Sequence, residues 1–479
     1  MKNKNLVHLT FAFLMLLTGL AEAADPLTLR KTVQRVIDEY PSVRLSRMQL
    51  DKARQDIVTA ESQLGWQLNA KAGGGHDIGF IGSPADTQTA GVGIQRQLSS
   101  GGTLGLSGSY SYEDDAVPLA GFPNPLTRTN ADISYRLPLR QGYGNPLYKQ
   151  AETSAYAGFD IARAGHRGLL TSVTQQVIDL YYGVAATQAR MKNTQTAVER
   201  AQRLLEFVRS NSRLGLAEKK DILQAEAQLR ATQADFESLK TAWEQQRTNL
   251  NRLMGRPWDE EIIVAPVAAP EANISNIDTL IAETEANNGD LVRLGAQLKI
   301  ADSSLQVAKD KYKNKLDLVM TAGTRNGSAP GFDQSDYAAT VNIEFQRPLS
   351  RQGLKAQVFK AQLDQDIARR EMEKTRDDIR YQVRGLVSEI TTAQAALAAL
   401  KERLATEQEK MQETRYRYRN GRADTSQVIQ FENELSFAEL AVDQQQIELA
   451  RKQHSLQLLR GSFWIANQLE NTGLEVNAK

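Results

Sequence analysis

Two very long helix-forming stretches constrain this fold more than any other feature of the sequence. Tyr148–Leu214 and Gln352–Arg419 each have the pattern of a nearly uninterrupted helix, over 67 and 68 residues. At about 1.5 Å per residue, each helix would be roughly 100 Å long, which no ordinary globular domain accommodates. Only 6% of the residues are aromatic, while Ala, Gln, Leu, Glu and Arg crowd the long segments, a composition typical of extended helices. The chain is therefore predicted to be elongated.

The sequence is also internally duplicated. Gly421 lies 206 residues after Gly215, and at this constant offset Ile222 falls on Val428 and similar residues continue to coincide without a gap. Both halves are predicted to have the same order of elements: a short helix, strands, a very long helix, a glycine turn and a returning helix. The predicted short helices are Ser42–Leu64 and Asp290–Asn314, and the predicted returning helices are Ala217–Met254 and Ala423–Arg460. We expect two structural repeats, 24–254 and 289–463, joined by a linker, 255–288, and followed by a tail, 464–479.

The first 23 residues have the pattern of a secretory signal peptide. Lys2 and Lys4 precede an apolar run, Leu6–Leu20, and the Ala-Glu-Ala sequence at 21–23 offers small residues for cleavage, so the mature chain would begin at Ala24. A membrane anchor would need about 20 apolar residues, and no other stretch approaches that length. Any contact with a membrane must therefore be made by strands. The chain has no cysteine, which excludes disulfides, thiolate metal sites and a lipid-modified cysteine.

Between the helices the hydrophobic period changes from about 3.6 residues to 2. Val341, Ile343 and Phe345 alternate with polar residues, and Thr103–Tyr112 alternates in the same way. One apolar and one polar face are typical of a membrane barrel with an aqueous lumen, although a soluble sheet with one face on a core also alternates. Long loops predicted at His76–Thr87, Glu113–Arg128 and Thr324–Ser335 contrast with a tight turn at 99–102, which favours the barrel.

Six strands are predicted, four before residue 140 and two between residues 316 and 348. A single-chain barrel needs about eight or more strands, so several copies of the chain must share one barrel. The expected fold class is therefore α+β, with a membrane β-barrel shared between subunits and long helices that continue from it.

In their order and spacing, the short motifs of this chain resemble those of the TolC-like outer-membrane efflux protein family, the outer membrane factors. The motifs are YPSV at 40–43, NGDL at 288–291, Pro138 and Pro348 at strand ends, and the helical turns SRLGLAEKKD and YRNGRADTSQ. The resemblance implies a homotrimer whose barrel contacts outer-membrane lipid. It also implies a long antiparallel α-helical coiled-coil tunnel in the periplasm, an equatorial segment at 255–288 and a C-terminal periplasmic tail at 464–479.

The implied location is the cell outer membrane, and the implied function is that of a channel subunit of a tripartite efflux or type I secretion system. Such a channel is a passive gated export duct. It would be coupled through a periplasmic adaptor (membrane fusion) protein to an inner-membrane pump of the RND, ABC or MFS type. The alternatives are a periplasmic coiled-coil adaptor, which would have one hairpin, and a structural coiled-coil protein, which would lack the strands.

The two glycine turns are expected to lie at the same end of the two long helices. The resemblance implies that this end is the periplasmic tip, where an adaptor would contact two sets of turn residues, which are Gly215, Leu216, Ala217 and Gly421, Arg422, Ala423. It also implies a latch in which the phenol of Tyr418 bonds the carboxylate of Asp221. The alternative for Asp221 is an ordinary acid in the first turn of a helix, where the helix dipole favours it.

This chain departs from the family pattern in two places. Ala423, Gln427 and Gln430 replace an arginine and two acids, so Gln427 and Gln430 would form a neutral polar pore constriction, or simply a solvated helix face. The hairpin Gln88–Tyr112 adds two strands to the usual four per subunit. It either joins the wall of the barrel, giving eighteen strands in a trimer, or lies outside it.

The sequence contains no pattern of catalytic or metal-ligating residues. His76, His166 and His454 have no paired ligand in the sequence, and no phosphate-binding lysine follows the three glycines at 73–75. The net charge is +1, which gives no indication of a nucleic-acid partner. We therefore expect no enzyme activity, no cofactor, no metal and no nucleic-acid binding.

Overall fold

The computed structural model describes residues 26–77, 85–116, 124–267, 276–467 and 469 of the chain. These residues form two compact units, each built from both halves of the sequence. The helical unit contains residues up to 47, then 166–289 and everything from 376 onward, and the sheet unit contains 48–165 and 290–375. The predicted signal peptide and its cleavage site lie outside the described residues, as do 268–275 of the linker and 470–479 of the tail.

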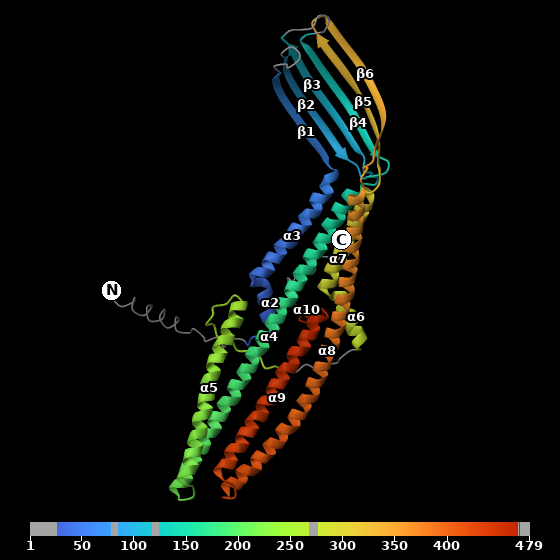
Figure 1. Ribbon diagram of the computed structural model, residues 1–479. Coiled ribbons are helices and arrows are strands. Elements are labelled where there is room, and N and C mark those ends of the chain that lie inside the picture. Colours follow the sequence, from blue (N-terminus) through green and yellow to red (C-terminus); the bar gives the residue numbers. More distant parts are fainter. Residues whose placement is uncertain (1–25, 78–84, 117–123, 268–275, 468, 470–479) are drawn as a thin grey trace, which may run out of the picture. The chain divides into compact units, whose positions relative to one another are not determined.

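The sheet unit contains a single antiparallel sheet of six strands in the order β1-β2-β3-β4-β5-β6 (Figure 1). The strands are β1 (Trp66–Asp77), β2 (Ala85–Gln97), β3 (Thr103–Asp115), β4 (Leu126–Pro138), β5 (Lys315–Ala329) and β6 (Phe332–Gln346). Six strands were predicted, four in the first half and two in the second, and this number is confirmed. The hairpin Gln88–Tyr112 corresponds to β2 and β3 and lies within the sheet, between β1 and β4.

The predicted long loop at Thr324–Ser335 is wrong. β5 continues to Ala329 and β6 begins at Phe332, so the two strands are joined by a tight turn at Gly331, whose φ of +77° suits glycine. Polar side chains face each other across this end of the hairpin, as in the 2.6 Å bond from the Ser335 hydroxyl to the Asn326 amide oxygen. Because this run of polar residues shows no alternation with apolar ones, its sequence resembles that of a loop although it forms the end of a hairpin. β1 to β4 likewise extend into the other two predicted loops.

The predicted long helices are present. They are α4 (Pro146–Arg213) and α8 (Gln352–Arg419), of 68 residues each. The returning helices are α5 (Lys219–Leu253) and α9 (Thr425–Leu459), and the short helices are α3 (Pro41–Glu61) and α7 (Gly289–Lys311). α9 begins two residues later than predicted because Asp424 caps it, with its carboxylate accepting from the Gln427 backbone N–H at 2.7 Å. Within the described residues, no helix combines the length and apolarity that a membrane span requires.

Three shorter helices were not predicted: α2 (Leu29–Glu39), α6 (Ile277–Asn287) and α10 (Phe463–Ala466). α2 begins at an N-cap threonine, Thr28, and buries Val33, Val36 and Ile37 on one side. These side chains enter the main apolar core of the helical unit, which also contains residues of α4, α5, α9 and α10. The short helices α2 and α10 thus contribute to a core that the longer helices α4, α5 and α9 also form.

An aromatic group lies at one side of this core. Tyr182, His454, Phe463 and Trp464 follow one another with ring centroids 5.8 to 6.0 Å apart. The His454 Nδ1 atom lies 2.9 Å from the Ala450 carbonyl oxygen and 2.9 Å from the Tyr182 hydroxyl. Protonation of His454 would place a positive charge on a ring that is packed among aromatic side chains.

We expect acid to destabilise the helical unit through His454, because burial lowers the pKa of its ring. In the unfolded chain this histidine has a pKa of about 6.5 and binds a proton more readily than it does in the folded chain. The contribution of neutral His454 to the free energy of unfolding is therefore fully present above that pH and decreases as the pH falls below it. In urea unfolding followed by circular dichroism, His454→Gln should lose less stability than the wild type between about pH 7 and pH 5. His76→Gln is the control, since His76 is exposed. A His454→Gln profile parallel to the wild type would contradict this assignment.

Candidate functional site

The first candidate site is the end of the helical unit where both hairpins turn. The α4–α5 and α8–α9 turns lie at the same end of this unit, as predicted (Figure 1). Gly215 and Gly421 adopt φ values of +73° and +67°, which allow the reversal. The first turn exposes two leucines, Leu214 at 70% and Leu216 at 75%, whereas the second presents polar residues at 420 and 422. The two turns therefore offer different chemistry to a partner.

Tyr418 lies just before the second turn and is about half-buried. Its hydroxyl is 2.9 Å from the Thr425 hydroxyl, and its ring centroid is 5.5 Å from that of Phe207 on α4. Burial raises the pKa of Tyr418, and the negative charges of Asp221 and Asp424 raise it further. The phenol therefore stays protonated and can donate a hydrogen bond at neutral pH.

Asp221 closes the first turn of α5. Its carboxylate accepts a 2.9 Å hydrogen bond from the Glu218 backbone N–H. The structure thus places Asp221 close enough to Tyr418 to affect its pKa, but gives each a different hydrogen-bond partner. In the described part of this single chain, no hydrogen bond joins the two side chains, and the latch stays a prediction.

Gln427 and Gln430, the predicted constriction residues, are both exposed on α9. The amide of Gln430 donates to Glu434 at 2.9 Å. Lys410 on α8 also pairs with Glu434 and lowers the pKa of its carboxyl, so this carboxylate stays charged. The surroundings of Gln430 are therefore charged rather than neutral. Among the described residues, no group of histidines and carboxylates is arranged to hold a metal ion.

A charged cluster that the sequence did not indicate joins the two hairpins. Arg200 of α4 is almost buried, with its side chain 10% exposed, and contacts three residues of α9. Its guanidinium lies 3.2 Å from Glu432, donates to both carboxylate oxygens of Glu439 at 3.0 and 3.3 Å, and donates to the Ser436 hydroxyl at 2.8 Å. Bidentate arginine–carboxylate pairs of this kind are strong and directional. Glu432 also pairs with Arg415 of α8.

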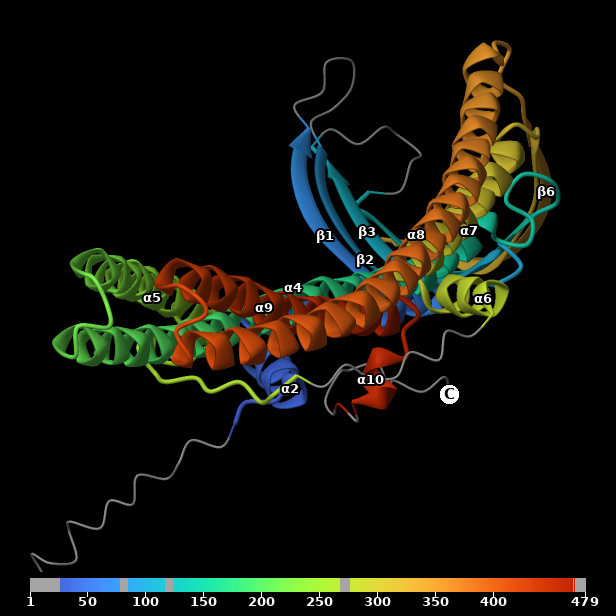
Figure 2. The same ribbon diagram turned by 90° about the horizontal axis from the view of Figure 1, so that it is seen from below.

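Some of the other contacts between the hairpins are polar as well, although Phe207 of α4 also packs against Tyr418 of α8. Gln228 of α5 donates to Asn433 of α9 at 2.8 Å, and Asn193 of α4 donates to Asp443 of α9 at 3.2 Å. Figure 2 shows α4 with α5 and α8 with α9 as two adjacent hairpins. Polar contacts of this kind can be exchanged for water, whereas an apolar contact cannot be separated without exposing apolar surface. The boundary between the hairpins therefore combines exchangeable polar contacts with apolar ones, such as Leu204 of α4 against the cluster of Met411, Val428 and Leu435.

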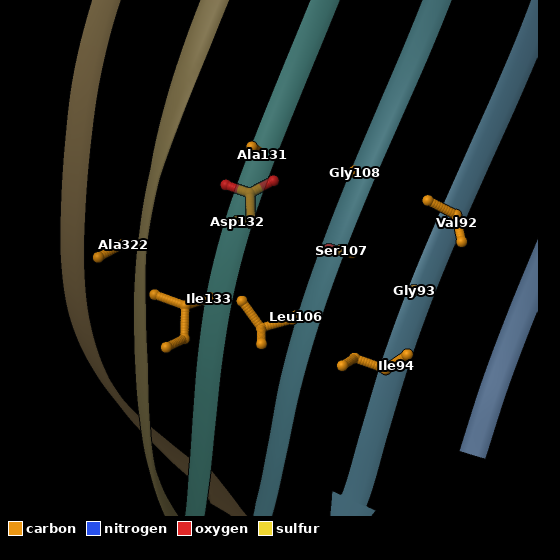
Figure 3. Close-up of a pocket in the computed structure, with 10 residues that line it drawn as sticks. All are labelled: Val92, Gly93, Ile94, Leu106, Ser107, Gly108, Ala131, Asp132, Ile133 and Ala322. Carbon is orange, nitrogen blue, oxygen red and sulfur yellow. The ribbon is translucent and has the colours of Figure 1, made fainter. Parts of the chain in front are cut away.

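The second candidate site is the six-stranded sheet, which has two chemically different faces. The pairing register aligns Ile94, Leu106, Ile133 and Ala322 in one row across β2 to β5, with Leu68 at its β1 end. Figure 3 shows side chains of this row beside a shallow groove, together with Val92. Apolar residues on this face remain exposed, for example 71% for Ile343 on β6. Among the described residues of this unit, none covers these side chains.

The opposite face of the sheet carries polar and charged residues. Arg136 of β4 donates to Asp317 of β5 at 2.8 Å and to Glu344 of β6 at 2.6 Å. Lys315 lies 3.6 Å from Asp317, so this cluster holds two positive and two negative groups. The predicted alternation of Val341, Ile343 and Phe345 with polar residues is therefore realised as two faces.

Comparison with known proteins finds a family model that matches part of the chain and solved structures that share its fold. Residues 89–256 match the outer membrane efflux protein family. The outer-membrane channel OprN superimposes with a TM-score of 0.66 at 17% identity, covering 91% of this chain and 90% of OprN. The outer membrane protein VceC of Vibrio cholerae gives 0.65 at 15% identity, covering 91% and 96%. The open state of the MtrE outer membrane channel of Neisseria gonorrhoeae gives 0.63 at 16% identity, covering 91% and 89%. No curated protein matches the chain.

At these identities the solved structures establish the fold alone. Independently, the family model matches the sequence of residues 89–256. Together they confirm the resemblance to the TolC-like outer-membrane efflux proteins. They also agree with the prediction that the chain is not an enzyme, because the family and these relatives are membrane efflux proteins and channels.

Proposed function

From the match to the outer membrane efflux protein family and the fold shared with its channels, we propose that this chain is a subunit of an export channel in the cell outer membrane. The proposal rests on one observation above all: a sheet with an exposed apolar face and a charged opposite face. A membrane barrel needs lipid-facing apolar residues on one side and water on the other. The helical part would then lie in the periplasm.

The sheet has two unpaired edges, β1 and β6, and a spanning sheet must be closed because lipid cannot satisfy backbone hydrogen bonds. We infer that three copies of the chain close one barrel, with the coiled-coil hairpins continuing as a tunnel. On this proposal each of the repeats 24–254 and 289–463 contributes one helical hairpin to the tunnel wall. The segment 255–288 is then the equatorial segment, and 464–479 is a periplasmic tail. Outer-membrane lipid would cover the apolar face.

The hairpin ends supply the features expected of a gate and a docking site. Tyr418 and Asp221 are proposed as the latch, and Gln427 and Gln430 as residues of the constriction. The exposed leucine turn at 214–216 and the polar turn around Gly421 are proposed to contact a periplasmic adaptor that couples the channel to an inner-membrane pump, in efflux or in type I secretion. The channel itself would be passive, and the pump would supply the energy.

Reconstitution in planar bilayers tests this function. The wild-type protein should give single channels of small conductance, because the hairpin ends restrict the pore. Tyr418→Phe combined with Asp221→Ala removes the Thr425 bond and the cap of α5 and should raise the conductance by loosening both turns, since a lost cap costs about 1 kcal/mol. Equal conductances would retain the channel and exclude these gate residues. A wild-type protein that forms no channels would contradict the proposed function.

A further inference from the structure

The β2–β3 hairpin is an integral part of the sheet. β2 pairs with β1 from Trp66↔Arg96 to Asp77↔Ala85, and β3 pairs with β4 from Thr103↔Arg136 to Glu113↔Leu126. Neither strand is short or at an edge. The hairpin therefore separates β1 from β4, which would otherwise be free to be neighbours.

The turn of this hairpin is also fixed to the segment that follows β4. The Gly144 backbone N–H donates to the Ser100 carbonyl at 2.8 Å, and the side chain of the buried Asn145 donates to the Leu98 carbonyl at 3.1 Å. Gly101 has a φ of +90°, and a Cβ atom there would lie 2.1 Å from the Gly142 carbonyl oxygen. Only glycine permits this close approach. The hairpin is thus held at its turn as well as along both strands.

On the polar face of the sheet the hairpin presents small, neutral residues. From Thr87 to Gln97 and from Thr103 to Ser111, this face carries only Gly, Ser, Thr and Gln; these residues are Thr87, Thr89, Gly91, Gly93, Gln95, Gln97, Thr103, Gly105, Ser107, Ser109 and Ser111. The neighbouring strand β4 presents Arg128, Asp132 and Arg136 on the same face. Over this length the hairpin therefore adds perimeter to this face without adding a charged side chain, and charge appears only near the end of β3, at Glu113, which pairs with Arg128, and at Asp115.

We propose that the β2–β3 hairpin widens the bore of the channel so that polar solutes of large cross-section pass through it. The inference rests on the proposed function, in which three chains share one barrel. Six strands per chain then give eighteen strands, against twelve without the hairpin. Because barrel diameter grows about linearly with strand number, the hairpin makes the barrel about 1.5-fold wider. Barrels of this size leave an aqueous channel.

The register of the sheet makes the hairpin removable. Trp66, Arg96, Leu104 and Tyr135 lie in one row across β1 to β4. Deleting residues 85–115 would bring Trp66 opposite Tyr135, with both side chains on the apolar face and the strands still antiparallel. A four-stranded sheet of unchanged polarity results, because removing two strands alters neither direction nor face.

Polymer exclusion in planar bilayers compares the two proteins. Polyethylene glycols of graded size, added to each side in turn, lower the conductance of a pore that they can enter. The largest polymer that enters the barrel should have a radius about one third smaller for the deletion variant than for the wild type. The same size limit in both proteins would overturn the inference while leaving the channel intact. Absence of wild-type channels would instead contradict the proposed function.

If the deletion variant does not fold, a second pair of variants tests whether the β2–β3 hairpin lines the bore. The chain contains no cysteine, so a single introduced thiol is a specific probe. Ser107→Cys places it on the polar face of β3, and Leu106→Cys places it on the apolar face of the same strand. A charged methanethiosulfonate reagent should change the current in steps for Ser107→Cys and leave Leu106→Cys and the wild type unchanged. An unmodified current for Ser107→Cys would show that the hairpin does not line the bore, and would overturn the inference.

Discussion

Replacing Arg200 by methionine is expected to open the channel more than any other single change at the hairpin ends. Methionine keeps much of the side-chain bulk but leaves Glu439 partly buried without its arginine partner, while Glu432 keeps only Arg415. Removing one member of a buried ion pair costs about 3 kcal/mol or more, so the contact between α4 and α9 would be weakened by roughly two orders of magnitude in its equilibrium constant. Single-channel recordings should show a larger and longer-lived open conductance than the wild type.

The matched control for this prediction is Arg209→Met. Arg209 is on the same helix and also forms an arginine–glutamate pair, but it contacts Glu226 within its own hairpin and is exposed to solvent. Exposed pairs contribute about 0 to 1 kcal/mol, so this variant should conduct like the wild type. If Arg200→Met also keeps the small wild-type conductance, the charged cluster does not restrain the hairpins.

Replacing Phe463 by alanine is expected to cause the largest loss of stability in the helical unit. The Phe463 side chain is completely buried and lies between the rings of His454 and Trp464. Truncation of a buried phenylalanine costs about 3 to 5 kcal/mol, because the apolar contacts are lost and a cavity remains. Urea unfolding followed by circular dichroism should show a midpoint shifted to clearly lower concentration. Faster proteolysis of the segment after α9 should accompany it.

Two further substitutions control for this effect. Phe463→Leu keeps most of the buried volume and should lose less than half as much stability as Phe463→Ala. Phe437→Ala removes the same type of side chain from an exposed position on α9, where it is 68% accessible. Its unfolding midpoint should be close to that of the wild type. An unfolding midpoint for Phe463→Ala equal to that of Phe437→Ala would contradict the role of the aromatic group.

The helices were predictable because local signals define both of their ends. Gln352–Arg419 was predicted with the bounds that α8 has, since Pro348 precedes it and Gly421 follows it. For α4 the structure adds Pro146 at its first turn, a position where proline is favoured and which the pattern of apolar residues does not reveal. The strand number was also predicted, because a period of 2 is clear in segments such as Thr103–Tyr112 and Val341–Phe345. The error at Thr324–Ser335 arose where cross-strand partners are polar on both sides, so that alternation disappears.

The charged cluster around Arg200 could not be predicted in the same way. Its partners lie more than 230 residues away in sequence, and periodicity identifies the face of a helix without identifying what that face contacts. The duplication does relate Glu226 to Glu432, yet Glu226 pairs with Arg209 in its own hairpin whereas Glu432 contacts both Arg415 and Arg200. At the same offset Arg415 is equivalent to Arg209, so the pair within each hairpin is repeated, and Glu432 differs only by its added contact with Arg200 of the other hairpin.

The open edges of the sheet also bear on biogenesis. A single chain carries an apolar face together with two edge strands, β1 and β6, whose outer edges are unpaired within the described sheet, and such surfaces favour aggregation in water. A chain that cannot close its own barrel is not ready to enter a bilayer alone, since the free edges would be stranded in lipid. On the proposed barrel of three chains, these edges must therefore stay shielded until the chains meet, before or during insertion.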